Sequence, residues 1–456
     1  MINSLFARHA LLPDGWQSDV RIAWDAHGNL TALTAGAARL PGETEAGLVL
    51  PGMVNLHSHA FQRALGGLTE TAGAGPDSFW TWRDLMYRFA RHITPEHIEA
   101  IAAQLFAECL RHGYTAVCEF HYVQRDQQGA MYARPAETAE RVVAAAALAG
   151  IGVTMLPVLY SYAGFGEQPL TSEQQRFQTG PREVSDIIAA LEPLRDPQVE
   201  VGVAPHSLRA AGVGQIGEVL ACLPADRPVH IHIAEQQGEI EQSIGATGMR
   251  PVRYLMEQFD LSERWCLVHA THLDAGESAA LAASGAVAGL CPTTEANLGD
   301  GLFALAPYLE RGGRFGIGSD SHVSHSPVEE LRWHEYGQRL LHQKRNVAAS
   351  LGQRRVGEFL WQGALAGGAL ASGRRVGELA TGKRADLLVL DSEHPNLFDV
   401  ATDDVLNTFI FCGNDNLVRD VMVGGRWVVR NRRHMAQAAI AQRYMHAIAE
   451  LRTLRA

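Results

Sequence analysis

The sequence predicts a parallel (β/α)8 barrel with a small β-sandwich built from both termini. From about residue 50 to 320, short apolar runs alternate with longer amphipathic segments, which is the pattern of strands buried on both faces and separated by helices. Both ends of the chain carry short alternating runs with turn residues instead. We therefore expect the barrel at 51–374 and the sandwich at 1–50 and 375–456.

Eight apolar runs are the candidate barrel strands. They are 53–56, 114–120, 152–158, 200–204, 229–233, 266–268, 286–290 and 315–318. The segment "TPEHIEAIAAQLFAECLRHG" predicts a helix that is capped by Thr94, has Pro95 in its first turn and ends at Gly113. Periodicity cannot show whether the sheet closes, so a doubly wound open sheet is the alternative.

The terminal segments predict paired strands and one last helix. "DVRIAWDAHGNL", "ADLLVLDS" and "VRDVMVGGRWVVR" alternate apolar and polar residues, and Gly424-Gly425 marks a hairpin in the third. The final stretch, from His434 to the end, predicts a helix. The longest uncharged run, 142–166, is interrupted by glycines and Pro157, which favours a helix end followed by a buried strand over a membrane span.

Composition excludes some classes of partner. The formal charge of −11 argues against binding to a phosphate backbone, which needs clustered Lys and Arg. The six cysteines are scattered and form no C-x-x-C motif, which is typical of reduced thiols in the cytoplasm. Arg8, His9 and Asp14 interrupt the beginning of the chain where an export signal needs an apolar segment. We expect a cytoplasmic protein with neither a nucleic-acid nor a membrane partner.

One His-x-His pair at the end of the first strand raises the question of a metal. His57 and His59 follow the apolar run of "PGMVNLHSH", and residues two apart on a strand point to the same face. With 20 histidines in 456 residues, such a pair is weak evidence by itself. In a barrel, however, catalytic groups lie at the carboxyl ends of strands, so the other strand ends test the idea.

Four other strand ends carry residues of the same kind. His206 and Arg209 end the fourth, His232 and Glu235 the fifth, His269 the sixth and Asp320 the eighth. Imidazole nitrogens and a carboxylate oxygen are the ligands that Zn2+ accepts, and an open coordination position then holds water. The convergence predicts a metal site at the barrel mouth.

Each of these residues also has a simpler interpretation. His230, two residues before His232, fits a core histidine better than a ligand, and we expect loop positions for His272, His322 and His325. Glu235 could simply cap a helix, but a carboxylate near a metal ligand is also suited to moving protons. Arg209 near the mouth favours an anion clamp over a surface ion pair.

The segments "PGMVNLHSH", "HIAEQ", "CLVHA", "GIGSDS" and "TGKRADLLVLD" resemble the amidohydrolase superfamily across essentially the whole chain. The resemblance implies a (β/α)8 barrel with a β-sandwich from both termini, and hydrolysis by metal-activated water. Binuclear members usually bridge two metals with a carboxylated lysine of the fourth strand, but the lysines here, Lys344 and Lys383, both follow the eighth strand. A Glu or Cys bridge is less easily excluded, although Ala204 and His206 occupy the end of the fourth strand.

The pattern looks instead like the mononuclear deaminase branch of that superfamily. This resemblance implies one Zn2+ per chain, with Fe2+ and Mn2+ also accepted by the same ligands. Its ligands would be His57, His59, His232 and Asp320. The branch further implies that His269 contacts the water or substrate, that Glu235 and Asp320 help to deprotonate the water, and that Glu235 returns the proton to departing ammonia. A homodimer is what the family suggests.

The substrate is expected to be a small amidine on a dicarboxylate. "NLHSHAFQRALGGLTE", "FWTWRDLMY", "CEFHYV", "PHSLRA" and "CPTTEANLGDG" resemble the iminohydrolases of a bacterial histidine-degradation route. Carried over from that resemblance, the residues that bind the dicarboxylate part are Gln62, Arg83, Tyr122, His206 and Arg209. We expect Trp80 and Trp82 to pack and hold the insertion after the first strand in place, rather than to stack on the ligand. The alternatives are a deaminase of guanine or an adenosine derivative, and a non-catalytic scaffold that should lack some of the ligands.

Overall fold

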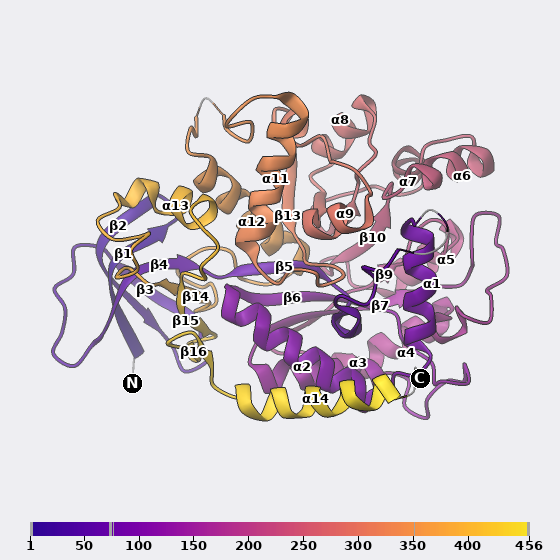
Figure 1. The fold of residues 1–456 in the computed structure, drawn as a ribbon, viewed down its shortest axis with the longest axis horizontal. Coiled ribbons are helices and arrows are strands. Elements are labelled where there is room, and N and C mark those ends of the chain that lie inside the picture. The colour runs from indigo at the N-terminus through magenta and orange to yellow at the C-terminus, as the bar shows by residue number, and fades with distance from the viewer. Residues whose placement is uncertain (1–2, 73–74, 76, 351, 454–456) are drawn as a thin grey trace.

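Parallel strands form a barrel in the centre of the computed structural model, which describes residues 3–72, 75, 77–350 and 352–453 (Figure 1). In the described residues the first strands pair in the order β5-β6-β7-β8, with β9 also on β7, and the later ones in the order β10-β11-β12-β13. The barrel strands are β5 (Met53–Ser58), β6 (Tyr114–His121), β7 (Gly152–Leu159), β8 (Val199–Val201), β9 (Ala204–Pro205), β10 (Val229–Ile233), β11 (Trp265–His269), β12 (Val287–Leu290) and β13 (Arg314–Ile317).

Two isolated bridges join these sheets into a closed barrel. Val203 pairs in parallel with Val229, and Ser58 pairs in parallel with Asp320. At the second junction the backbone N–H of Asp320 donates to the His57 carbonyl at 3.0 Å. The closure confirms the predicted barrel and excludes the doubly wound open sheet.

The predicted fourth strand differs most from the structure, because 200–204 is divided into β8 and β9. Gly202 lies at the break, and a Cβ atom there would come within 2.4 Å of the Pro228 carbonyl oxygen. The close approach of the next strand therefore requires glycine and bends the chain at this point.

Helices cover the outside of the barrel. The predicted helix after the first strand is α2 (Pro95–His112), where Thr94 Oγ1 accepts from the backbone N–H of His97 and Gly113 adopts φ +108°. The others are α1 (Phe79–Ala90), α3 (Glu137–Ala149), α4 (Pro181–Leu191), α5 (Val213–Cys222), α6 (Gln237–Thr247), α7 (Pro251–Gln258), α8 (Ala275–Ser284), α9 (Pro292–Leu298), α10 (Leu305–Leu309), α11 (Pro327–His342) and α12 (Val356–Ser372), followed by α13 (Val405–Phe411) in the C-terminal region.

Strands from both ends of the chain form one sheet beside the barrel. In the described residues its order is β17-β16-β15-β14-β4-β1-β2-β3, so the N-terminal and C-terminal strands join where β14 pairs with β4. Its strands are β1 (Asn3–Leu12), β2 (Gly15–Trp24), β3 (Leu30–Thr34), β4 (Thr44–Pro51), β14 (Leu387–Leu390), β15 (Val418–Val423), β16 (Arg426–Arg430) and β17 (Arg433–His434). The predicted joint β-structure is confirmed, as one continuous sheet.

Alternating residues give this sheet two buried faces. In β14, Leu388 and Leu390 belong to the barrel-side core, while Leu387 and Val389 belong to a separate core of the terminal strands. This period of two fixes the sheet against the barrel. Gly424 and Gly425, with φ +54° and +75°, form the predicted hairpin turn between β15 and β16.

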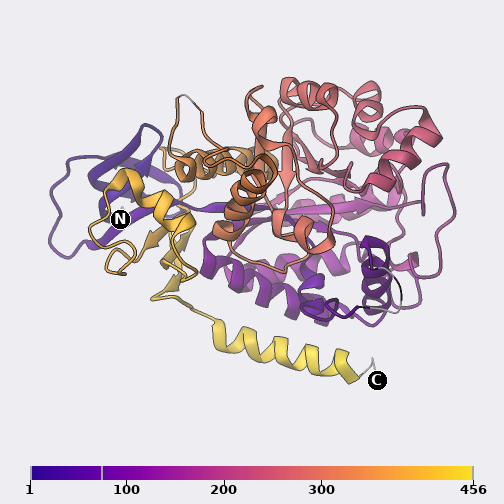
Figure 2. The ribbon, with the colours of Figure 1, turned by 45° about the horizontal axis from the view of Figure 1, so that its top comes forward.

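The last helix, α14 (Gln437–Thr453), lies along the outside of the barrel (Figure 2) and packs beside α2 (Figure 1). His97 of α2 contacts Glu450 of α14 at 2.9 Å. Residues 454–456 of the predicted terminal helix lie outside the described residues. Within those residues, no helix combines the length and the apolar character that crossing a bilayer requires.

Candidate metal centre and adjoining cavity

Three histidines and one aspartate converge at the carboxyl ends of the barrel strands. The Nε2 atom of His57 lies 3.1 Å from that of His59 and 3.0 Å from that of His232. Asp320 Oδ1 is 3.4 Å from His57 Nε2 and 3.3 Å from His59 Nε2. The structure therefore brings together all four residues that the sequence predicts as ligands.

The spacing of these groups and the tautomer of His59 fit a metal ion. Tetrahedral Zn2+ with ligand distances of about 2.0–2.1 Å places its ligand atoms roughly 3.3 Å from one another. His59 Nδ1 donates to the Phe120 carbonyl oxygen at 2.8 Å, so its Nε2 presents a lone pair to the cluster. Lone pairs this close repel one another unless a cation lies between them, and the donor set of imidazoles and a carboxylate suits Zn2+.

Burial keeps the cluster in the protonation state that a cation requires. Desolvation lowers the pKa of His57 to about 3 and lowers those of His59 and His232 as well. For Asp320, burial acts to raise the pKa, but the hydrogen bond with His57 holds it well below the usual value. Neutral imidazoles and an ionised carboxylate are ready to bind a divalent cation without losing protons.

Glu235 and His269 lie beside this cluster. His269 Nε2 is 3.7 Å from Glu235 Oε1 and 3.8 Å from Asp320 Oδ2. Its other nitrogen, Nδ1, is 3.3 Å from Glu295 Oε1. Burial raises the pKa of Glu235 to about 7, although the charges of His269 and Arg209 act to lower it. A carboxyl group poised near neutrality can both accept and return a proton.

The backbone at these strand ends adopts the left-handed conformation. His269 has φ +67°, Asp320 φ +44° and Ala234, just before Glu235, φ +53°. Such angles cost energy for residues other than glycine, and they cluster where side chains must be aimed at a site. The sequence pattern gave no sign of them.

A cavity of about 50 Å³ opens onto the cluster. Its lining includes His59, His232 and Asp320 of the cluster, Glu235 and His269 beside it, and side chains of α1 such as Phe79 and Arg83. All five residues predicted to bind substrate line this cavity: Gln62, Arg83, Tyr122, His206 and Arg209. Distant segments thus meet at one small chamber.

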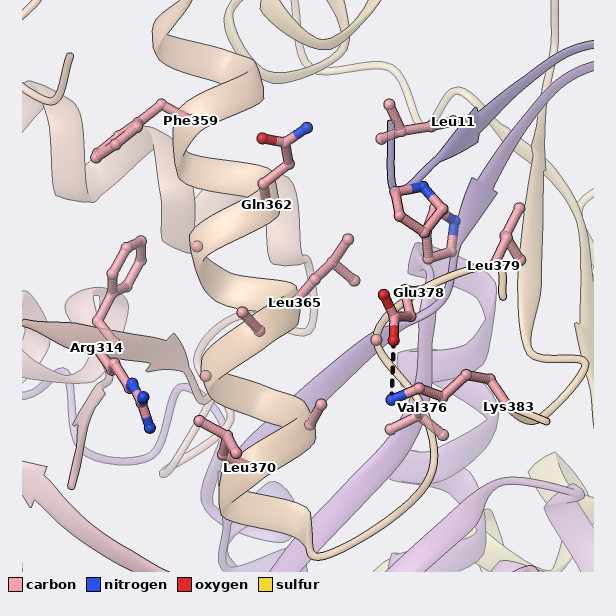
Figure 3. Close-up of a pocket in the computed structure, with 18 of the residues that line it drawn as sticks. Leu11, Arg314, Phe359, Gln362, Leu365, Leu370, Val376, Glu378, Leu379 and Lys383 are labelled. Atoms are coloured by element: carbon pink, nitrogen blue, oxygen red, sulfur yellow. Dashed lines mark ion pairs between the residues drawn. The ribbon is translucent and has the colours of Figure 1, made fainter. Parts of the chain in front are cut away.

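A larger cavity of about 830 Å³ lies elsewhere, between α12 and the terminal sheet (Figure 3). Arg314, which lines it, begins β13, whereas Asp320 follows the end of that strand, so the two cavities lie at opposite ends of the barrel. Its Lys383 pairs with Glu378 at 3.0 Å. Leu11, Leu365, Leu370 and other apolar side chains line much of the rest. Despite its size it contains no ligand cluster among the described residues, so we place the chemistry in the smaller cavity.

Two arginines of the small cavity lack protein acceptors. Neither Arg83 nor Arg209 donates a hydrogen bond to any described residue, and the Nε atoms of both are buried without a partner. Arg227, which is buried to a similar degree as Arg209, bonds to Glu200, Glu192 and the Val201 carbonyl. Arg209 is buried and Arg83 is half-buried. Guanidinium groups withdrawn from water normally have such acceptors, so both are suited to bind an anion.

Trp80 contacts both of these arginines. Its ring centre lies 4.5 Å from the Arg83 guanidinium carbon and 5.8 Å from that of Arg209. The predicted packing role of Trp80 therefore includes cation–π attraction to both guanidinium groups. Trp82 lines the cavity.

The remaining predicted binding residues are held by local contacts. Gln62 Nε2 donates to the Tyr122 hydroxyl at 2.7 Å, and Gln62 Oε1 is buried without a partner in the described residues. The His206 ring lies 4.9 Å from that of His232 and its Nδ1 is 3.1 Å from Ser207 Oγ. These polar groups border the cluster of candidate ligands.

Other histidines fall outside the cluster. His230 Nε2 donates to the Ala371 carbonyl at 2.8 Å, as a core histidine does, and His272 Nε2 donates to the Asp300 carbonyl. His322 and His325 follow β13 in a loop, as expected, but His322 is only 2% exposed. It contacts Ser58 Oγ at 3.2 Å and so connects to the strand that carries His57 and His59.

Sequence reasoning missed several buried carboxylates around the site. Glu119 accepts from Ser58 Oγ and from the Ala60 N–H, next to the paired histidines. Glu295 faces His269, and Glu239 accepts from the backbone N–H groups of Ala234 and Glu235. Glu295 lies in the quoted string "CPTTEANLGDG", but only the fold shows which side chain it contacts.

Comparison with known proteins gives consistent matches along the chain. Residues 48–428 match the Amidohydrolase family, and residues 2–47 match the model described as "Formimidoylglutamate deiminase HutF, N-terminal domain". Formimidoylglutamate deiminase of Pseudomonas aeruginosa is 52% identical over 451 residues, which cover 99% of this chain and 100% of that protein. A 5-methylthioadenosine/S-adenosylhomocysteine deaminase of Natronomonas pharaonis is 27% identical over 401 residues, covering 86% and 83% of the two chains.

Solved structures agree with the fold. The crystal structure of an amidohydrolase from Brucella melitensis aligns with a TM-score of 0.93 at 43% identity, covering 98% of this chain and 99% of that one. An adenosine deaminase from Xanthomonas campestris with bound zinc has a TM-score of 0.79 at 21% identity, covering 99% and 98%. At that identity the second structure supports the fold alone.

Proposed function

The chain belongs to the amidohydrolase family, and we propose that its small cavity holds one Zn2+ and hydrolyses N-formimidoyl-L-glutamate to N-formyl-L-glutamate and ammonia. The reaction is a hydrolytic deimination in histidine degradation, and the enzyme is a hydrolase of C–N bonds. Amidohydrolases depend on a metal, and His57, His59, His232 and Asp320 would hold it here. When bound, the cation makes a water molecule nucleophilic at neutral pH.

The observation that carries the substrate assignment is the pair of arginines without protein acceptors. Arg83 and Arg209 line the cavity that contains Glu235 and Asp320. A substrate with two carboxylates supplies the acceptors that both guanidinium groups lack. Gln62, Tyr122 and His206 would complete the binding of the glutamate part. A purine has no carboxylate for these cations, so this feature favours the amidine of a dicarboxylate over guanine or an adenosine derivative.

Glu235 would move the protons of the reaction. Its carboxylate accepts a proton from water as the water oxygen bonds to the formimidoyl carbon, and this addition gives a tetrahedral carbon. The amidine enters protonated, and Glu235 then returns the proton to its departing nitrogen. Asp320 accepts the remaining hydroxyl proton as the formyl C=O forms, so the C–N bond breaks and ammonia leaves. His269, 3.7 Å from Glu235, and Asp320 would orient the water and the amidine.

A direct assay tests the assignment. Protein of known metal content should release ammonia from N-formimidoyl-L-glutamate and not from guanine or adenosine. Ammonia from guanine but not from formimidoylglutamate would contradict the substrate, and no turnover of any of these by metal-loaded protein would favour the scaffold alternative.

We also propose a cytoplasmic homodimer. All six cysteines are free in the structure, and unpaired thiols are typical of a reducing compartment. The dimer rests on the resemblance alone, and light scattering of the purified protein would test it.

A further inference from the structure

A buried carboxylate, Glu239, lies directly behind the cavity. Its side chain accepts from the Ala234 N–H through Oε1 at 3.2 Å and from the Glu235 N–H through Oε2 at 3.3 Å. The same Oε2 atom lies 4.0 Å from Arg209 Nε. Glu239 is fully buried, and it contacts both the proton-transfer residue and the substrate clamp of the proposed function.

Helix capping explains only part of this arrangement. Glu239 is the third residue of α6, where a glutamate commonly reaches back to backbone N–H groups before the helix. Here it holds the turn in which Ala234 has a left-handed φ, so it fixes the direction of Glu235. Helix capping does not explain the proximity of Glu239 to Arg209, because Arg209 belongs to a different segment, the loop after β9.

The distance between the Glu239 carboxylate and Arg209 allows Glu239 to balance the charge of Arg209 while the N–H groups of Arg209 stay free. At 4.0 Å the contact is too long for a hydrogen bond but close enough to offset the charge of a buried guanidinium. Arg209 is only 7% exposed and donates to no described residue, so its N–H groups stay available for a ligand. A carboxylate at hydrogen-bond distance would occupy those donors.

We propose that Glu239 is a positioning residue that holds Arg209 for the substrate carboxylate and Glu235 for proton transfer. The inference rests on the proposed function, because it assigns Glu239 a task in dicarboxylate binding. It predicts that one substitution behind the cavity changes both substrate affinity and turnover.

The chain offers a matched control in Glu277. This residue is the third of α8, is 2% exposed, and accepts from the N–H groups of Asp274 and Arg253. It pairs with Arg250 at 2.7 Å and is absent from the lining of the cavity. Glu277→Gln therefore measures the cost of losing a buried capping carboxylate without touching the site.

The experiment compares Glu239→Gln with Glu277→Gln in metal-loaded enzyme. We expect Glu239→Gln to raise KM for N-formimidoyl-L-glutamate at least tenfold and to lower kcat, while Glu277→Gln changes both less than twofold. The dissociation constant of N-formyl-L-glutamate, measured by calorimetry, should rise in parallel with KM. Because Glu239 acts through Arg209, adding Glu239→Gln to Arg209→Ala should raise KM no further.

Either of two results would overturn the inference. One is a Glu239→Gln enzyme whose KM and kcat match those of Glu277→Gln, and another is an increase in KM that persists undiminished in the Arg209→Ala background. If Glu239→Gln does not fold, Glu239→Asp, which keeps the charge but shortens its reach, replaces it with the same expectations. A wild-type enzyme that binds N-formyl-L-glutamate but releases no ammonia from formimidoylglutamate would contradict the proposed function alone, since calorimetry still tests the role of Glu239.

Discussion

The Nε2 atoms of His57 and His232 lie 3.0 Å apart, although the two residues are separated by 175 positions in the chain. They end β5 and β10, which belong to different halves of the barrel. Only barrel closure brings these strand ends together. With His59 and Asp320 they form the centre of the proposed site.

Loss of a ligand should remove the metal. We expect His232→Ala to lose bound zinc and activity together, because three remaining groups hold a cation far more weakly than four. Metal content by elemental analysis after dialysis checks this. His230→Ala is the control on the same strand, and it should lower thermal stability while keeping the metal. Full zinc occupancy in His232→Ala would remove His232 from the ligand set.

Glu235→Gln should keep the metal and lose turnover. The amide preserves size and hydrogen bonding but cannot accept a proton, so we expect kcat to fall by about 10²–10⁴-fold. Steady-state kinetics with measured metal content test the expectation. A near-normal rate in protein that retains zinc would exclude Glu235 from proton transfer.

Activity should fall on the acid side because Glu235 must be ionised to accept a proton. Burial raises the pKa of Glu235 to about 7 in the metal-free protein, and a bound cation nearby acts to lower it again. The acid limb of kcat/KM should therefore have its midpoint above the ordinary glutamate value and below about 7. Activity is retained above that midpoint and lost as the pH falls through it. An activity that rises toward pH 4 would contradict this role.

Arg209→Ala should weaken substrate binding more than it affects folding. Charge-assisted hydrogen bonds contribute about 1.5–3 kcal/mol, so KM should rise by roughly 10- to 150-fold. Arg227→Ala, at a buried arginine with protein acceptors, should instead lower the melting temperature and leave KM unchanged. Equal KM values for wild type and Arg209→Ala would show that another group holds the carboxylate.

Outside the site, Glu43 should contribute to the stability of the fold in a pH-dependent way. Burial opposes its ionisation, but hydrogen bonds from Arg21, the Leu40 N–H and Ser4 dominate and lower its pKa to about 2. Because the folded pKa is below the unfolded one, the contribution is complete above about pH 4.5 and is lost as the pH falls toward 2. Glu43→Gln should lower the melting temperature at pH 7 and have less effect at pH 3. A difference that grows on acidification would contradict the assignment.

Much of the fold could be predicted from local pattern. The alternation of apolar runs with amphipathic helices predicted the barrel strands to within a few residues, and the sequence signals of Thr94, Pro95 and Gly113 predicted the bounds of α2. The fourth strand was the exception, because its division at Gly202 depends on the approach of Pro228 from another part of the chain. A long-range contact leaves little trace in local periodicity.

The sequence by itself determined the kinds of side chain at each strand end and the period that points them toward one mouth, because those follow from composition and strand geometry. The sequence indicated the candidate metal ligands and the candidate anion-binding arginines, but not the groups that contact them. Only the tertiary structure decided that Arg83 and Arg209 lack hydrogen-bond acceptors, that Trp80 lies close to both, and that Glu239 and Glu295 contact residues beside the cluster of histidines and Asp320. The reason is physical: each of these properties is a distance between segments far apart in the chain, and folding alone sets such distances.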